Sequence, residues 1–383
     1  MDFDIKYKDF RQEIRAYCEE KIAPHAVEVD RDQFYSREIH EDINRKGWWG
    51  SIVPKDYGGL GLSTVEYAII VEEISRVCGS TGLTFAAHNS LGTFPIYAFG
   101  TESQRKKYLP EAAEKGKLIA FGLTEPEAGS DAGGTKSRAE KKEYGYLING
   151  TKCWITSANV CDTAIITART SDEGGVHGIS SFIVEKGMEG FSAGKKENKM
   201  GCRGSNTAYL HLDDLKISID YLIGKEGEGF KQFMITLDGG RISIGAMAIG
   251  LAQAALETAA RYSESTLENG KPINRHQSIQ FKLADMAMQV EAARLLMYKT
   301  AWLKDNKHRY TKLSAMCKLY ASEVSHYCTY QAIQILGLDG ITEDFPAERY
   351  FRDMKLCEIG EGTSEVQRIV IAREALHELI PKI

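Results

Sequence analysis

The feature that most constrains the fold is a change of sequence texture that occurs twice along the 383 residues. Residues 1–117 carry apolar side chains at helical spacing, as at Phe10 and Ile14. From 118 to 225, glycine is frequent and short β-rich runs alternate with turns. Helical spacing then returns over 226–383. This order predicts a multidomain α+β protein: an N-terminal helical domain, a middle β-domain and a C-terminal helical domain.

The middle region is predicted to be a small β-barrel or sandwich. Its β-rich runs include Tyr146 to Ile148 and Trp154 to Thr156. The Asn149-Gly150 pair between these two runs predicts a hairpin turn.

The last region is predicted to be an antiparallel four-helix bundle. Three long amphipathic stretches span about 229–267, 274–304 and 310–336. A loop follows, and a last helix is expected over about 364–378.

Composition narrows the classes of partner. A net charge of −5 and a pI near 6.1 argue against nucleic acid as the main partner, although they leave room for a local anion site. The eight cysteines show no C-x-x-C spacing and the nine histidines no metal-finger pattern, so we expect free thiols and no metal site. The charged N-terminus is unlike a signal peptide, and the apolar run 242–252 is about half a membrane span. We therefore expect a cytoplasmic protein with no membrane span.

Two loops of the middle region could face a ligand. The run FGLTEPEAGSDAGG at 121–134 lacks both the dinucleotide and the phosphate-loop patterns. It is either a surface turn between domains or a nest in which Thr124 and Ser130 face a polar ligand. The run TKCWITSA at 151–158 has the pattern of a half-buried strand, and a Trp in a strand usually serves packing.

The run CEIGEGTSEVQR at 357–368 carries more chemical information. Ser364 and Gln367 have the spacing of a capping box, with Thr363 a rival cap, so a helix is expected to start here. Glu361 lies just before that start, between two glycines that permit a sharp turn and a close ligand. It is either a base pointing into a pocket or an exposed loop acid near a helix dipole.

The run LDGGR at 237–241 is a further candidate. Asp238 and Arg241 are three residues apart and share a helix face. They could hold an anionic or amide-bearing ligand, or form an ordinary surface ion pair.

Taken together, these motifs resemble the acyl-CoA dehydrogenase family. The resemblance includes FGLTEPEAGSD, WITSA, FKLADM at 281–286, QILG at 334–337, RDMK at 352–355 and EGTSEVQ at 361–367, in matching order over about 260 residues. It implies the same three-part fold, FAD as cofactor, and a homotetramer in which FAD is held partly across a subunit interface.

The resemblance also implies a role for individual residues. Glu361 matches the catalytic base of short- and medium-chain members, and the rival base position of another subgroup is Gly240 here, which cannot serve. The implied cofactor-binding residues are Phe121, Leu123, Thr124, Ser130, Trp154, Ile155, Thr156, Gln277, Gln334, Gly337, Thr363 and Glu365. The implied substrate-binding residues are Ser130, Asp238, Arg241, Gly360 and Gly362.

The reaction that this resemblance implies is α,β-dehydrogenation of an acyl-CoA thioester to a 2-enoyl-CoA. Glu361 would take the α-proton while flavin N5 takes the β-hydride, and an electron-transfer flavoprotein would accept the electrons. An acyl-CoA oxidase, an enoyl-CoA reductase on the same scaffold, and a flavin-poor CoA-binding or scaffold protein are the alternatives.

The sequence departs from the family pattern in two places. Thr266, Asn269 and Leu338 replace an arginine, a phenylalanine and a glycine that serve the ADP half of FAD, and Lys271 or Arg275 could compensate. Gly360 stands where straight-chain members often carry Tyr. A missing ring would leave room for a short, branched or alicyclic acyl group such as cyclohexane- or cyclohexene-carboxyl, unless a neighbour fills the gap.

Overall fold

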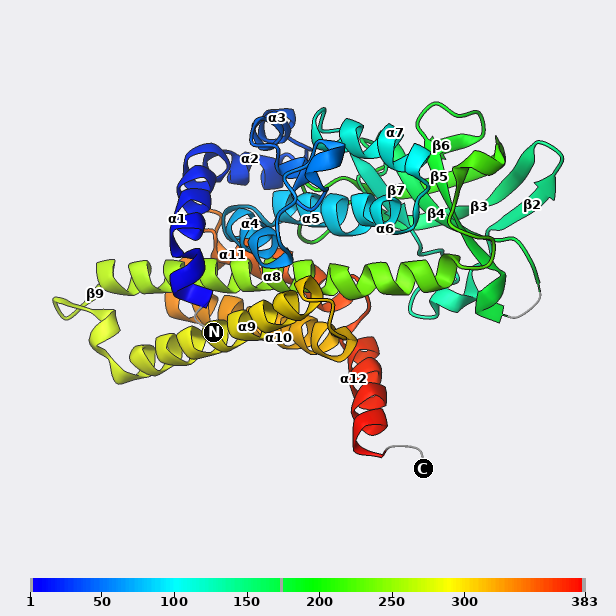
Figure 1. Ribbon diagram of the computed structural model, residues 1–383. Helices are drawn as coiled ribbons and strands as arrows, with labels where there is room; N and C mark the ends of the chain where they lie inside the picture. Colours follow the sequence, from blue (N-terminus) through cyan, green and yellow to red (C-terminus); the bar gives the residue numbers. More distant parts are fainter. Residues whose placement is uncertain (1–2, 173–174, 381–383) are drawn as a thin grey trace.

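The computed structural model describes residues 3–172 and 175–380, and it confirms the order helices, strands, helices (Figure 1). The first helical region covers one side of the long central helix. Its helices are α1 Phe3–Lys21, α2 Ala26–Arg31, α3 Arg37–Arg45, α4 Thr64–Val77, α5 Gly79–Ala87, α6 Phe94–Phe99 and α7 Glu102–Ala113. Between α5 and α6 lies η4, His88–Thr93, a π-helical turn that contacts α8.

The middle region forms an eight-stranded sheet in the order β6-β7-β3-β2-β4-β5-β8, with β1 pairing β4 in parallel. Its strands are β1 Ile119–Gly122, β2 Arg138–Lys142, β3 Gly145–Thr156, β4 Thr163–Arg169, β5 Ile179–Glu185, β6 Phe191–Ala193, β7 Thr207–Ile217 and β8 Leu222–Ile223. Strand β4 is buried along most of its length, because it pairs with β1, β2 and β5 and lies inside the sheet.

The Asn149-Gly150 hairpin is a wrong prediction. Both residues lie inside the continuous strand β3, at a register shift against β7. The turn that joins β2 to β3 lies instead between Lys142 and Gly145. A Cβ on Gly150 would lie 2.2 Å from Ser137 Oγ, and Asn149 Oδ1 accepts a hydrogen bond from Asp214 N at 2.8 Å. The pair therefore builds a β-bulge with close backbone packing.

The C-terminal region packs around α8, which is 37 residues long. Its helices are α8 Gly229–Ser265, α9 Gln277–Asp305, α10 Thr311–Leu336, α11 Ala347–Ile359 and α12 Ser364–Leu379, with a small hairpin of β9 Leu267–Glu268 and β10 Lys271–Pro272 between α8 and α9. Helix α8 has the length and composition of a membrane span, but 83% of its most apolar window is buried inside the protein. It is the core helix of the bundle.

Helix α11 occupies part of the stretch that the sequence predicted to be loop. Pro346 stands at its N-cap, and Tyr350, Met354 and Cys357 are buried along one face. It leads directly into the Gly360–Gly362 turn, so this missed helix fixes the place from which Glu361 projects.

Candidate active site

The turn at Gly360–Gly362, called the Glu361 loop below, joins α11 to α12. Glu361 has φ 55° and Gly362 φ 91°, so two successive residues adopt the left-handed region. That region costs a non-glycine residue roughly 1–2 kcal/mol. Thr363 caps α12 by accepting a hydrogen bond from Val366 N at 3.3 Å. The predicted capping box at Ser364 is therefore wrong, and its rival Thr363 is the cap.

The Glu361 carboxylate lies against α8. A Cβ added to Gly240 would stand 2.2 Å from Glu361 Oε2, so only glycine leaves room for the carboxylate at this point of the helix. Oε2 is buried and has no hydrogen-bond partner among the described residues. Burial raises the pKa of Glu361 to about 8, although the charges of Lys318 and Arg241 act in the opposite direction. A carboxylate of this kind can take a proton near neutral pH.

Asp238 and Arg241 form a largely buried pair on α8 that flanks Gly240 in the sequence. Arg241 Nη1 donates to Asp238 Oδ1 at 2.7 Å, and Thr311 Oγ1 donates to Asp238 Oδ2 at 2.7 Å. The two side chains are only 17% and 7% exposed, so the alternative of an ordinary surface ion pair is wrong. Burial raises the pKa of Asp238 and lowers that of Arg241. Their assignment to CoA stays a prediction.

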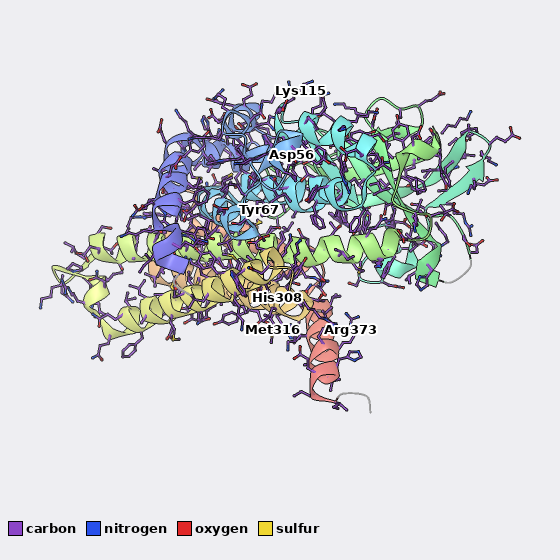
Figure 2. All side chains as sticks on the ribbon, in the orientation of Figure 1. Asp56, Tyr67, Lys115, His308, Met316 and Arg373 are labelled. Atoms are coloured by element: carbon purple, nitrogen blue, oxygen red, sulfur yellow. The ribbon has the colours of Figure 1, made fainter. Side chains whose placement is uncertain are left out.

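The α9–α10 turn comes close to α12 on this side of the bundle. Arg309 of the turn pairs with Glu374 of α12, and Figure 2 labels the neighbouring His308 and Arg373 at the same junction. This ion pair joins the turn to α12, and the charge of Arg373 on the same helix lowers the pKa of both Asp238 and Arg241.

A second group of predicted residues lines the end of β1, the loop after it and the end of β3. Cys153 N donates to Thr124 O at 2.9 Å, which holds the 121–134 loop beside β3. Trp154 has φ 61° at a register shift between β3 and β7, and its side chain is 58% exposed. The interpretation of Trp154 as ordinary strand packing is therefore wrong. The bulge turns the ring outward, where it can contact a ligand.

The other residues of this group differ in exposure. Ile155 is buried, Phe121, Leu123, Thr124 and Thr156 are half-buried, and Ser130 is exposed. Phe121 stacks on Phe233 of α8 with ring centroids 4.1 Å apart. Phe233 lies seven residues before Gly240, about 10 Å along the helix. The β1–β3 surface and Glu361 therefore lie within reach of one extended ligand.

A buried ion pair that sequence analysis missed supports this surface. Lys152 Nζ donates to Glu125 Oε1 at 2.6 Å, to Thr167 Oγ1 at 3.1 Å and to Leu123 O at 3.3 Å. Glu125 Oε2 in turn accepts from Lys136 N at 2.6 Å. Strand alternation would place Lys152 and Trp154 on one face, but the bulge between them sends one inward and the other outward.

The remaining cofactor candidates lie at the other end of the bundle. Gln277 begins α9, whose far end brings Lys304 Nζ to within 2.9 Å of the place where a Cβ on Gly239 would stand. Gln277 is thus about 40 Å of helix away from the Glu361 end. Gln334 and Gly337 stand at the end of α10, about 35 Å from Thr311. Figure 1 shows β9 and the start of α9 at the left end of the bundle and α12 at the right.

The remaining residues of the prediction lie close to Glu361. Glu365 is exposed in the first turn of α12, and Gly360 caps α11 through its N–H to Leu356 O at 2.8 Å. Within the described part of the chain, no group of three or more His, Cys, Asp and Glu side chains could hold a metal.

Comparison with known proteins agrees with this architecture. The chain matches the N-terminal, middle and C-terminal domains of acyl-CoA dehydrogenase over residues 6–116, 120–215 and 227–376. It is 47% identical to the probable acyl-CoA dehydrogenase YngJ of Bacillus subtilis, over 98% of this chain and 100% of that one.

Two solved structures are similar over nearly their whole length. Butyryl-CoA dehydrogenase from Megasphaera elsdenii has a TM-score of 0.94 at 42% identity, with 96% of this chain and 97% of that chain covered. A chain from the structural work on the electron transferring flavoprotein of Acidaminococcus fermentans has a TM-score of 0.96 at 43% identity, with both chains fully covered. The chain belongs to the acyl-CoA dehydrogenase family.

Proposed function

We propose that this protein catalyses the FAD-dependent α,β-dehydrogenation of a short-chain acyl-CoA thioester, with Glu361 as the base. The observation that carries the proposal is the buried Oε2 of Glu361, which has no hydrogen-bond partner among the described residues and lies against Gly240. A buried polar atom without a partner is costly, so its retention favours a chemical role over a structural one.

Glu361 would remove the α-proton of the thioester and hold it on Oε2. Because burial raises the pKa of Glu361 to about 8, the carboxylate can both take up and release a proton near neutral pH. A bound acyl chain excludes water from the carboxylate, which strengthens it further as a base. Glycines on both sides of Glu361 let the thioester approach closely. Asp238 and Arg241, which flank Gly240 on α8, are placed to hold the CoA end.

The residues around β1 and β3 fit the isoalloxazine ring of FAD. Trp154 offers an exposed aromatic face, and the loop beside it carries the half-buried Thr124. The buried Lys152–Glu125 pair makes this surface rigid. When bound, FAD supplies the acceptor for the β-hydride of the substrate.

A second copy of the chain would complete the cofactor site. Gln277, Gln334 and Gly337 lie too far from Trp154 within one chain to bind the same FAD. Helix α9 also carries a stripe of exposed apolar residues seven apart: Phe281, Met288 and Leu295 are 63%, 64% and 47% exposed. Such a stripe is suited to burial against another copy of the chain, which is consistent with a homotetramer that shares FAD between subunits.

The altered ADP end of this site has a partial local explanation. Asn269 has φ 52° and Gly270 φ 74°, so they form the tight turn of the β9–β10 hairpin, where asparagine is well tolerated. Lys271 and Arg275 are exposed beside it and remain our candidates to replace the missing arginine. Loss of FAD affinity in a Lys271→Ala, Arg275→Ala double mutant tests this compensation, and unchanged affinity contradicts it.

The space beside Gly360 favours a branched or alicyclic acyl group within the short-chain class. The atoms nearest to a Cβ on Gly360 would all belong to Leu356, with its O and Cδ2 3.3 and 3.7 Å away, and the absence of a ring at this position supports a wider acyl pocket. Turnover of cyclohexanecarboxyl-CoA should then exceed that of butyryl-CoA. A clear preference for butyryl-CoA rules out this acyl class while leaving the dehydrogenase proposal intact.

Anaerobic mixing of the purified FAD-loaded protein with a panel of acyl-CoA thioesters tests the function itself. We expect bleaching of the flavin by a short acyl-CoA, and reoxidation by an electron-transfer flavoprotein faster than by oxygen. A protein that binds FAD but is bleached by none of the thioesters contradicts the proposal, and rapid oxygen consumption would favour an oxidase.

A further inference from the structure

Lys318 of α10 is a buried cation without an acidic partner. Its side chain is fully buried, and no carboxylate lies within ion-pair distance of Nζ in residues 3–172 and 175–380. Nζ instead donates to two backbone carbonyls, Glu358 O at 3.0 Å and Gly362 O at 2.7 Å. Burying an ammonium without a counter-ion is expensive, whereas a methionine would fill the same space at no such cost.

The two carbonyls lie on either side of Glu361. Glu358 is the second-last residue of α11, and a lysine near the end of a helix commonly satisfies a free carbonyl. Gly362 lies beyond that helix, after the left-handed Glu361, so helix capping does not account for the second hydrogen bond. One ammonium therefore ties the end of α11 to the start of α12 across the Glu361 loop.

The loop needs such support because its backbone is strained. Gln367 Nε2 also donates to Gly362 O at 2.8 Å, and more weakly to Glu361 O at 3.3 Å. Together Gln367 and Lys318 satisfy the carbonyls on both sides of the Glu361 side chain. A strained backbone conformation persists only where surrounding contacts stabilise it, and the hydrogen bonds from Lys318 and Gln367 are such contacts.

Lys318 also acts on Glu361 through its charge. Of the groups that lower the pKa of Glu361 against the effect of burial, Lys318 is the stronger and Arg241 of α8 the weaker. Burial lowers the pKa of Lys318 itself to about 8, and Cys357, Glu361 and Glu358 oppose that change. The hydrogen bonds of Lys318 go to carbonyls, so its cation influences the carboxylate without neutralising it in an ion pair.

We propose that Lys318 is a positioning residue for the base: its ammonium bridges the carbonyls of Glu358 and Gly362 and fixes the turn that directs the Glu361 carboxylate toward the substrate. This inference rests on the proposed function of Glu361 and adds a residue that never touches the substrate.

The test compares Lys318→Met, Lys318→Gln and Lys318→Arg with the wild type in the FAD-loaded enzyme. We expect the Met and Gln variants to reduce the flavin about 10- to 100-fold more slowly at saturating acyl-CoA, with a smaller change in KM, because misplacement of the base affects the chemical step. Arg keeps the charge and the donors and should recover part of the rate. Lys355→Met removes an exposed lysine that pairs with the Glu358 side chain, and it should behave as wild type.

Two further measurements separate positioning from general stability. The rate should rise with pH at a higher pH in the Met and Gln variants, because they lack the cation that lowers the pKa of Glu361, and at an unchanged pH in the Arg variant. The other titratable or charged groups near Glu361, which are Arg241, Asp238 and Tyr67, are the same in all variants. Hydrogen exchange should accelerate in peptides covering 358–364 and not in peptides of α10. If Met fails to fold, Gln decides the outcome.

Unchanged flavin reduction, pH profile and loop exchange in a folded Lys318→Gln or Lys318→Met protein would overturn the inference. The same holds if stability falls while the rate per folded molecule stays constant. A wild-type enzyme that no acyl-CoA reduces would instead refute the proposed function, so the two failures are distinguishable.

Discussion

The buried carboxylates of Glu72 and Glu361 have pKa values that are shifted in opposite directions. Glu72 belongs to a group, called the Arg–Glu cluster below, that joins α1, α4 and α9: Glu72 accepts from Arg11 at 2.8 Å and from Arg294 at 3.0 Å, and both glutamates of the cluster, Glu72 and Glu73, are fully buried. The second carboxylate is that of Glu361, whose Oε2 is buried without a partner among the described residues. Burial raises the pKa of both Glu72 and Glu361, but the two guanidinium groups more than reverse this effect at Glu72.

The difference lies in where the nearby cations place their hydrogen bonds. Around Glu73, Arg15 and Arg76 point at the carboxylate, each with a donor 2.9 Å from Oε2. Around Glu361, Lys318 bonds to carbonyls and Arg241 to Asp238. A buried carboxylate is thus made structural or basic by the orientation of its neighbours, and the presence of positive charge nearby does not decide between the two.

The largest effect is expected from Glu361→Gln. Loss of the base should slow flavin reduction by a short acyl-CoA roughly 10²- to 10⁴-fold, because a positioned general base contributes about that much. The urea midpoint should not fall, since Glu361 Oε2 makes no hydrogen bond to the described part of the chain that the amide would lose. Stopped-flow flavin absorbance and urea unfolding measure the two quantities. A variant that keeps its rate would remove Glu361 from the mechanism.

Glu72→Gln should lower the stability of the protein and leave the rate of flavin reduction nearly unchanged. Breaking a buried ion pair from one side leaves Arg11 and Arg294 without their counter-charge, at a cost of about 3–5 kcal/mol in the free energy of unfolding. The rate per folded molecule should stay close to that of the wild type. Glu291→Gln is the matched control, because Glu291 pairs with the same Arg294 but is 44% exposed, and it should cost under about 1 kcal/mol.

Glu361 and Glu72 also show which features of the protein could be predicted from the sequence and which could not. Its helical periodicity anticipated α8, α9, α10 and α12, and the glycines around Glu361 pointed to a turn with a candidate base. The class of fold and the family were both predicted correctly. The pairing of Glu72 was not foreseen, because its arginines are 61 and 222 residues away in the sequence.

The residues that sequence analysis missed or misinterpreted have a common feature: their roles depend on contacts that form only in the folded chain. Lys152 and Lys318 are charged residues at buried positions, and each is stabilised by partners that only the folded chain brings near. Asn149-Gly150 has the local signal of a hairpin, but pairing with β7 over most of β3 overrides it. Trp154 points outward because of a bulge that strand alternation cannot predict.

Gly240→Ala should force the Glu361 carboxylate to move. The new Cβ would lie 2.2 Å from Glu361 Oε2 and 2.8 Å from Leu91 Cδ2, so the carboxylate must shift by about an ångström. Flavin reduction should slow roughly 10- to 100-fold. Gly239→Ala is the control, since its Cβ would meet only the flexible end of Lys304, and it should retain the wild-type rate. Equal rates for the two variants would contradict the placement of Glu361 against α8.

The smallest effect is the dependence of stability on pH, which should have opposite signs in the two regions. Glu361 has a folded pKa of about 8, above its ordinary value of 4.5, so its contribution to stability is complete below pH 4.5 and falls as the pH rises through 8. Unfolding of Glu361→Gln should therefore become more costly than that of the wild type by about 1–3 kcal/mol between pH 5 and 8. The pKa of Glu72 is lowered, so its contribution is present above its ordinary pKa and lost in acid. The deficit of Glu72→Gln should accordingly shrink below about pH 4 and stay level from pH 6 to 8. Urea unfolding of both variants from pH 3 to 9 measures these differences, and parallel curves for Glu361→Gln and the wild type would show that the carboxylate is not basic in the folded protein.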